Sequence, residues 1–125
     1  MKPIILGPTE GERLVIHGAN VMTFKAVEQD TSAHFSLCHY EAAAGWPGPE
    51  PHTHPDFEEA FYILEGEFEF MVGGQLVRAR PGSFLLVPRG VEHTFSNPSD
   101  APARLLGIFS PSGAEEAFRR RAQAE

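Results

Sequence analysis

Short runs of apolar and β-branched residues recur along the chain, and glycine or proline separates most of them. Within several runs apolar and polar residues alternate, which is typical of strands with one buried and one solvated face. In the clearest case, Phe68 and Phe70 alternate with Glu67 and Glu69. We expect strands at 13–17, 21–27, 33–41, 59–66, 67–72, 75–79, 83–88, 92–97 and 103–110.

The strongest local prediction is a hairpin that joins the runs 67–72 and 75–79. Gly73 and Gly74 lie between them, and both can adopt the positive φ that a two-residue hairpin turn requires. Many short strands with regular turn signals indicate an all-β sandwich or barrel rather than a helical protein.

The C-terminal segment departs from this pattern. It contains good helix formers and no β-branched residue, and its acidic residues precede its arginines, as the helix dipole favours. Ser112 and Glu115 match the S-x-x-E capping box. We therefore predict a short terminal helix at about 113–124, with Phe118 packed against the strands or a neighbouring molecule.

Length and composition are those of one globular domain, residues 1–125. The chain has 125 residues, of which 42% are hydrophobic, and this is enough for a core without disulfides. Its net charge of −7 argues against a nucleic-acid partner, which would need a basic face. No apolar run approaches the roughly 18 residues of a membrane span, and the N-terminal apolar run is too short for a signal peptide.

The chain contains a single cysteine, Cys38, which cannot form an intrachain disulfide. A reducing cytoplasm is therefore the expected location. Cys38 lies within a strand-like run, and we interpret it as a packed thiol rather than a nucleophile.

Candidate chemistry begins in the stretch EPHTHPDFEEAFYILEGE at 50–67. His52 and His54 are two residues apart, so on an extended segment they point to the same side. Pro51 and Pro55 favour such an extended backbone. Two imidazoles on one side are suited to bind a metal, but histidine pairs also occur on ordinary loops, and the pair alone leaves both interpretations open.

A second stretch, PGSFLLVPRGVEHTFSN at 81–97, favours the metal. Together the two stretches, with motifs at 45–66 and 82–97, resemble the paired motifs of the cupin superfamily. The first family motif is His-x-His, three or four residues, Glu, six residues, Gly. It matches His52, His54, Glu59 and Gly66, and the glycine that usually opens it is displaced by one residue, at Gly45.

The second family motif is Gly, five residues, Pro-x-Gly, two residues, His, three residues, Asn. It matches Gly82, Pro88, Gly90, His93 and Asn97 at every spacing. At ordinary residue frequencies, agreement of both motifs by chance is on the order of one in a billion. The ending GIFSPSGAEEAF also resembles the quercetin-dioxygenase-like branch of small bacterial cupins.

The resemblance implies a jelly-roll barrel, or double-stranded β-helix, that encloses one metal ion. By position, the ligands are His52, His54, Glu59 and His93. Three imidazoles and one carboxylate suit a divalent transition metal such as Fe, Mn, Ni, Zn or Cu, whereas Ca²⁺ and Mg²⁺ prefer more oxygen. Glu58 competes with Glu59 because the family tolerates either spacing, but Glu59 alone is followed by glycine at the motif distance.

Strand parity suggests further pocket residues, each with a plain structural alternative. Phe61 and Ile63 share the parity of Glu59 and are either cavity wall or barrel core. Val91 and Phe95 share the parity of His93, with the same two alternatives.

Outside the motifs, His39 shares a face with Phe35 and Leu37, and it either points toward the cavity or is an ordinary strand histidine. Trp46 lies in a stiff loop before the ligands and either caps the pocket mouth or lies in a subunit contact. His17 and His34 lack motif support and are interpreted as surface or strand residues.

The resemblance implies a metal-dependent enzyme of dioxygenase type that acts on a small enolic or phenolic substrate, with Glu59 both as ligand and as catalytic base. The alternatives are a non-catalytic module that binds a small molecule or a metal, and a metal-dependent isomerase or lyase for a sugar or keto acid. Dependence on oxygen separates the two enzyme classes, and tight binding without turnover identifies the module. The expected partners are a small molecule and a second copy of the chain, with neither nucleic acid nor membrane.

Overall fold

The computed structural model describes residues 2–125, which form nine strands, a short 3₁₀ turn and one helix. In chain order the elements are β1 (Glu12–Ile16), β2 (Asn20–Ala26), η1 (Glu28–Asp30), β3 (Ser36–Ala42), β4 (Glu58–Glu65), β5 (Phe68–Val72), β6 (Gln75–Ala79), β7 (Phe84–Val87), β8 (His93–Ser96), β9 (Ala103–Ser110) and α1 (Ala114–Ala124). The predicted all-β class with a C-terminal helix is confirmed.

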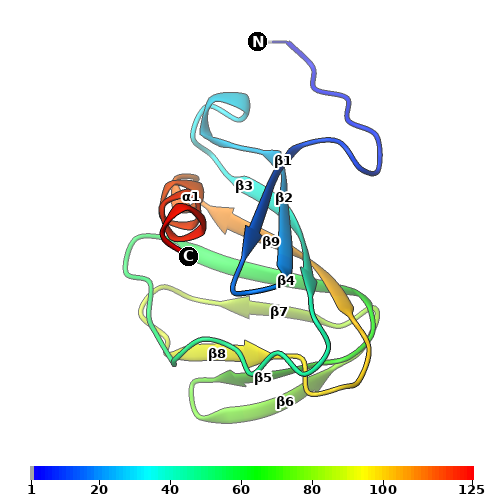
Figure 1. Ribbon diagram of the computed structural model, residues 1–125. Coiled ribbons are helices and arrows are strands. Elements are labelled where there is room, and N and C mark those ends of the chain that lie inside the picture. The colour runs from blue at the N-terminus through cyan, green and yellow to red at the C-terminus, as the bar shows by residue number, and fades with distance from the viewer. Residues whose placement is uncertain (1) are drawn as a thin grey trace.

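The strands form two antiparallel sheets that face one another (Figure 1). The larger sheet has the order β1-β2-β3-β9-β4-β7, and the smaller has the order β6-β5-β8. Strand β9 lies between β3 and β4, so the last strand of the chain pairs with two much earlier ones. This arrangement brings β4 and β8, which carry candidate ligands, to opposite walls of one barrel.

Alternation along the strands builds the interior. Phe68 and Phe70 are fully buried, as their alternation with glutamates predicts. The Phe70 ring packs against Phe61 of β4 in the facing sheet and against Phe95 of the neighbouring β8, with centroid separations of 4.9 Å and 5.3 Å. Burial of such large aromatic side chains is the main contribution to barrel stability.

The hairpin between β5 and β6 has its predicted turn. Val72 pairs with Gln75, which leaves Gly73 and Gly74 as the two turn residues, with φ of 55° and 81°. The start of β3 differs from its prediction. Residues 28–35 form η1 and the turn after it, so the strand begins at Ser36 instead of Ala33.

Helix α1 begins at Ala114, close to the predicted boundary, but the predicted capping box is wrong. Gly113 is the N-cap, and no side chain caps the helix. Glu115 instead turns into the protein and accepts hydrogen bonds from Ser36 Oγ at 2.5 Å and the Gly113 backbone N–H at 3.0 Å. The buried hydroxyl of Ser112 has no partner among the described residues.

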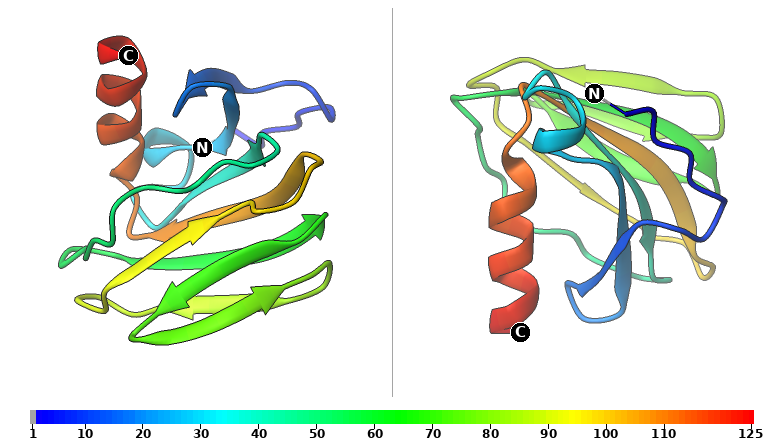
Figure 2. Two further views of the ribbon diagram at one scale, coloured as in Figure 1. Left: turned by 60° about the horizontal axis from the view of Figure 1, so that its bottom comes forward. Right: turned by 90° about the horizontal axis from the view of Figure 1, so that it is seen from above.

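The helix packs beside the strands, as the two further views show (Figure 2). Phe118 contacts Phe109 of β9 with ring centroids 5.6 Å apart, which confirms that Phe118 docks the helix on the barrel. None of the helices in residues 2–125 has the length and apolarity needed to cross a bilayer.

Candidate metal centre

Three histidine side chains converge inside the barrel. His52 and His54 come from the segment that leads to β4, and His93 opens β8. One ring nitrogen from each lies within 4.8 Å of the other two. A backbone bridge fixes part of this spacing, because His52 N donates to His93 O at 3.0 Å and His93 N donates to His52 O at 2.9 Å.

Backbone carbonyls orient two of the three rings. The Nδ1 atom of His52 lies 2.9 Å from the carbonyl oxygen of Glu50, and Nδ1 of His93 lies 2.9 Å from that of Val91. A carbonyl only accepts hydrogen bonds, so both Nδ1 atoms carry hydrogen. The Nε2 atoms are then directed to the cluster, which is how proteins commonly orient metal-binding histidines.

Glu59 adds a carboxylate to the cluster. Its Oε1 lies 3.1 Å from Nε2 of His93 and 3.6 Å from Nε2 of His54, and the residue is only 7% exposed. Glu58 lies on the opposite face of β4 because side chains alternate along a strand. There it forms an exposed ion pair with Arg89. The structure thus brings Glu59, and not Glu58, to the three histidines.

The pKa shifts at the cluster reflect this carboxylate. Burial lowers the pKa of His93, but the hydrogen bonds to Glu59 and to the Val91 carbonyl outweigh burial, so the net shift is upward. The pKa of His54 is lowered by burial, and the charge of Glu59 opposes this only in part. The carboxylate that stabilises a proton on His93 is equally suited to stabilise a metal cation, and metal binding there would release the proton.

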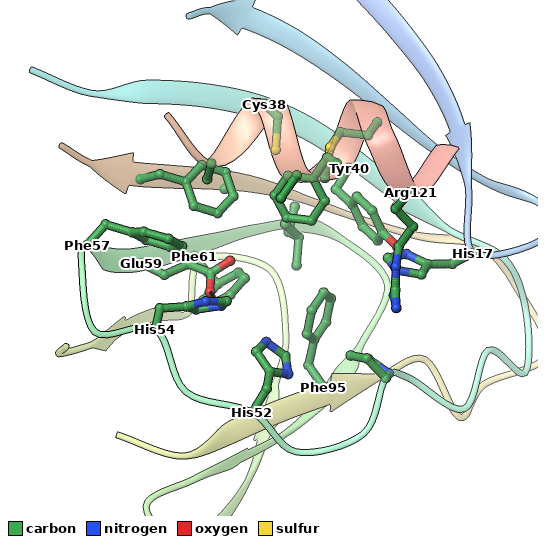
Figure 3. Close-up of a pocket in the computed structure, with 18 of the residues that line it drawn as sticks. His17, Cys38, Tyr40, His52, His54, Phe57, Glu59, Phe61, Phe95 and Arg121 are labelled. Carbon is green, nitrogen blue, oxygen red and sulfur yellow. Dashed lines mark hydrogen bonds and ion pairs between the residues drawn. The ribbon is translucent and has the colours of Figure 1, made fainter. Parts of the chain in front are cut away.

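The cluster lies in a cavity of about 480 Å³ (Figure 3). Most of the wall is apolar, and a volume of this size is typical of small-molecule sites. Phe57 stacks on His54 with ring centroids 4.4 Å apart and an interplanar angle of 24°. Other aromatic wall residues are Phe61, Phe95, Phe109 and Phe118.

Of the pocket residues that strand alternation suggested, some line the cavity and others belong to the surrounding core. Phe61 and Phe95 line the cavity. Ile63 points inward as its parity predicts and is fully buried, but it belongs to the core and not to the cavity wall. Val91 packs near the β5–β6 turn, within reach of Gly73, and its contribution to the site is the carbonyl that orients His93.

Of the two alternatives for His39, the structure contradicts the cavity position and supports the ordinary strand histidine. In β3 the buried residues are those of the other parity, including Cys38 and Tyr40, which line the cavity. His39 therefore faces outward, between Leu37 and Glu41 on the same face. Trp46 is 9% exposed and also does not line the cavity.

Sequence reasoning missed several wall residues, namely His17, Tyr40, Phe57 and Arg121. No local pattern marks them, because they come from a turn, a strand, a loop and the terminal helix. Cys38 also faces the cavity. Burial, together with the charge of Glu59, raises the pKa of its thiol to about 12, so the thiol stays neutral and is a poor nucleophile.

Comparison with known proteins gives one family match. A family model described as a cupin domain matches residues 38–109. Quercetin 2,3-dioxygenase of Bacillus subtilis (strain 168) is 30% identical over 117 residues, which are 94% of this chain and 34% of that protein. Germin-like protein subfamily 2 member 2 of Arabidopsis thaliana is 32% identical over 114 residues, 87% of this chain and 49% of that protein. The chain thus spans a third to a half of the length of these curated relatives.

Solved structures show a similar fold. The structure of KdgF from Halomonas sp. aligns with a TM-score of 0.79 at 16% identity, over 93% of this chain and 99% of that one. An RmlC-like cupin from Shewanella frigidimarina NCIMB 400 aligns with a TM-score of 0.76 at 20% identity, over 93% and 96%. With the two antiparallel sheets, these matches show a jelly-roll β-barrel.

Proposed function

Because this chain belongs to the cupin family, we propose that it is a metal-dependent enzyme of dioxygenase type that acts on a small enolic or phenolic substrate. The observation that carries the proposal is the cluster of three histidines and one buried glutamate in the wall of an apolar cavity. The similarity to a relative named quercetin 2,3-dioxygenase supports the reaction type.

The donor set fits a divalent transition metal. Nitrogen from His52, His54 and His93 with oxygen from Glu59 is a mixed shell suited to Fe, Mn, Ni, Zn or Cu. The Nδ1–H groups of His52 and His93 are already committed to carbonyls, so each ring offers only Nε2. When bound, such a metal would supply Lewis-acid chemistry at an oxygen of the substrate, and Fe, Mn, Ni or Cu would also supply redox chemistry.

The side chains of the chain itself would then position the substrate and move its proton. The aromatic wall favours a flat ring, as Phe61 and Phe95 present apolar surface to the cavity and exclude water from it. The Glu59 carboxylate lines the same cavity, and we assign it the removal of the proton from the enol or phenol oxygen.

Metal analysis combined with an oxygen electrode tests this function. Protein purified without a histidine tag should contain about one Fe, Mn, Ni or Cu per chain, and it should consume oxygen with at least one compound from a set of flavonols, catechols and β-diketones. Full metal content without oxygen uptake would contradict the dioxygenase and favour an isomerase, a lyase or a binding module. Failure to bind any metal after reconstitution would contradict the metal centre itself.

We also propose that the protein acts as a homodimer through the outer face of β4 and β7. Tyr62 and Phe84 are paired across these strands and are 43% and 61% exposed, and Leu86 beside them is 54% exposed. Strand β7 is also the last strand in the order of its sheet, and within residues 2–125 no strand pairs with its other edge. A two-fold contact between copies would cover the apolar side chains and the edge together.

The double substitution Phe84→Glu, Leu86→Glu should convert the dimer to a monomer, because it places charges in an apolar contact. Light scattering coupled to size exclusion measures the mass directly. Leu76→Glu is the matched control, since Leu76 is 58% exposed but lies on the smaller sheet, and it should leave the dimer intact. A wild-type monomer, or a dimer that survives the double substitution, would refute this interface.

A further inference from the structure

A group of polar side chains lies on the side of the cavity away from His52 and His54 (Figure 3). His17 comes from the turn after β1, Tyr40 from β3 and Arg121 from α1, and all three line the cavity. The mechanism proposed above uses none of them. In each of their hydrogen bonds, the chemistry of the partner identifies the donor and the acceptor.

Arg121 fixes the tautomer of His17. Its Nη1 lies 3.1 Å from Nε2 of His17, and because a guanidinium only donates, this nitrogen must accept. The hydrogen of the His17 ring is then on Nδ1, which lies 2.9 Å from the hydroxyl oxygen of Tyr40 and donates to it. Burial and the charge of Arg121 lower the pKa of His17, which is consistent with a neutral ring.

Asn20 supplies a second hydrogen bond to the same oxygen. Its Oδ1 accepts from the backbone N–H of Ala43 at 2.8 Å, and this orients the amide. Its Nδ2 therefore donates to the Tyr40 hydroxyl at 2.7 Å. A phenol oxygen that accepts two hydrogen bonds has only its own hydrogen left to give.

That hydrogen has no acceptor within residues 2–125. Tyr40 is only 2% exposed, and burial raises the pKa of its phenol, so the proton is retained. A buried donor without an acceptor destabilises the folded protein. Because Tyr40 is part of the cavity wall, a bound ligand is the natural source of the missing acceptor.

We propose that the Tyr40 hydroxyl donates a hydrogen bond to a carboxylate or carbonyl oxygen of the ligand, at the end remote from the metal centre. The ligand is then a flat, mainly apolar molecule with oxygen groups at both ends. The proposal rests on the proposed function in one respect, namely that the other oxygen group faces the histidine cluster. His17 and Arg121 are positioning residues that hold the Tyr40 hydroxyl as a donor.

The surroundings keep this arrangement fixed. His17 has a φ of 54°, in the left-handed region that is uncommon for residues other than glycine. Trp46 packs behind both rings, with centroids 5.5 Å from His17 and 5.8 Å from Tyr40. The conformation of the turn and the packing of Trp46 both direct the imidazole onto the Tyr40 hydroxyl.

Calorimetric titration with two probes tests the proposal. 6-Hydroxy-2-naphthoate has oxygen groups at both ends, and 2-naphthol lacks the carboxylate. In the Zn²⁺-loaded protein, Tyr40→Phe should weaken binding of the naphthoate tenfold or more, as expected for a buried hydrogen bond to a charged group, and should change binding of 2-naphthol less than about twofold. Tyr62→Phe removes the only other phenol hydroxyl of the sequence, which does not line the cavity, and should change neither affinity.

The proposal would be overturned if the wild type did not bind the naphthoate more tightly than 2-naphthol. It would also be overturned if Tyr40→Phe weakened binding of both probes equally, or weakened binding of neither. Repeating the titration with chelator-treated protein separates this proposal from the metal-dependent function. A selective Tyr40 effect in a protein that neither binds metal nor consumes oxygen would refute that function and leave the Tyr40 contact standing.

The tautomer of His17 gives a second readout that a purely structural role would not require. Nitrogen-15 spectra should show hydrogen on Nδ1 and none on Nε2. Arg121→Met removes the donor to Nε2 and should yield a mixture of tautomers with severalfold weaker naphthoate binding, whereas Arg120→Met on the same helix should do neither. Hydrogen on Nε2 in the wild type would mean that Tyr40 donates to His17, and this would overturn the proposal.

Discussion

Replacing Glu59 by glutamine should weaken divalent metal binding roughly 100-fold or more, whereas the same change at the neighbouring Glu58 should leave it unaltered. Loss of a hydrogen-bonded partner outside the ligand set already costs a metal site about 10–100-fold, and Glu59 is assigned to the set itself. Its Oε1 lies 3.1 Å from Nε2 of His93, while Glu58 pairs with Arg89 on the outer face. Competition with a chromogenic chelator for Zn²⁺ or Mn²⁺ measures both affinities.

The two substitutions are closely matched, because both remove one negative charge from β4 without changing side-chain size. Circular dichroism should show an intact barrel for each. In Glu59→Gln the pKa of His93 should also fall, since the carboxylate that holds it up is gone, and proton NMR of the metal-free protein would follow this. If the two substitutions weakened metal binding equally, or if Glu58→Gln weakened it more, Glu59 would not be a metal ligand.

The choice between these two glutamates could be predicted from the sequence because it depends on a local rule. Side chains alternate along a strand, so two adjacent residues must lie on opposite faces, and the spacing to Gly66 identifies which face is inside. The convergence of His52 and His54 on His93 follows less directly. It depends on the backbone bridge between the two segments, which only the tertiary fold provides.

For His39, side-chain alternation left both alternatives open, because both faces of β3 carry apolar residues. The outward set includes Leu37, whereas the buried set contains Cys38 and Tyr40. Hydrophobicity alone therefore favours the wrong face. A strand that lines a cavity needs side chains suited to a ligand rather than the most apolar ones, and alternation does not distinguish a core from a cavity wall.

The polar side of the cavity lay beyond sequence reasoning for a different reason. His17 and Arg121 are hydrogen-bonded but 104 positions apart, and neither stands in a recognisable pattern. The failed capping box has a related cause. Glu115 matches the box in sequence, but a buried serine from β3 and two backbone N–H groups compete for its carboxylate and bind it in the protein interior.

Glu115 also gives the largest expected effect on stability. Glu115 is 2% exposed, and its carboxylate accepts hydrogen bonds from Ser36 Oγ, from Gly113 N and, through Oε2 at 2.8 Å, from Glu28 N. In Glu115→Gln one oxygen becomes an N–H₂ group that faces a donor. We expect a loss of about 3 kcal/mol in the free energy of unfolding at neutral pH, measured by urea denaturation. Glu116→Gln is the control, because Glu116 is exposed and its ion pair with Arg119 lies on the surface.

The effect should depend on pH in a defined direction. Burial raises the pKa of Glu115, but the hydrogen bonds from Ser36 and the backbone outweigh it, so the net shift is downward. A carboxyl whose folded pKa is depressed contributes its stability above its unfolded pKa near 4.5, and this contribution is lost as the pH falls through the folded pKa. The difference in the free energy of unfolding between wild type and Glu115→Gln should therefore decrease below about pH 4.5. A difference that stays constant at acidic pH would contradict the role assigned to the Glu115 carboxylate.

The loss of stability in Glu115→Gln should be confined to α1, and because this helix forms part of the cavity wall, ligand binding should be affected too. The carboxylate ties the first turn of α1 to β3, and the same helix carries Phe118 and Arg121 into the cavity wall. Hydrogen exchange in Glu115→Gln should accelerate first in α1, while the amides of β4 and β9 stay protected. Binding of 6-hydroxy-2-naphthoate should weaken together with helix protection, whereas the metal content should not change. Uniform acceleration across the barrel would instead mean that the helix and the strands unfold as one unit.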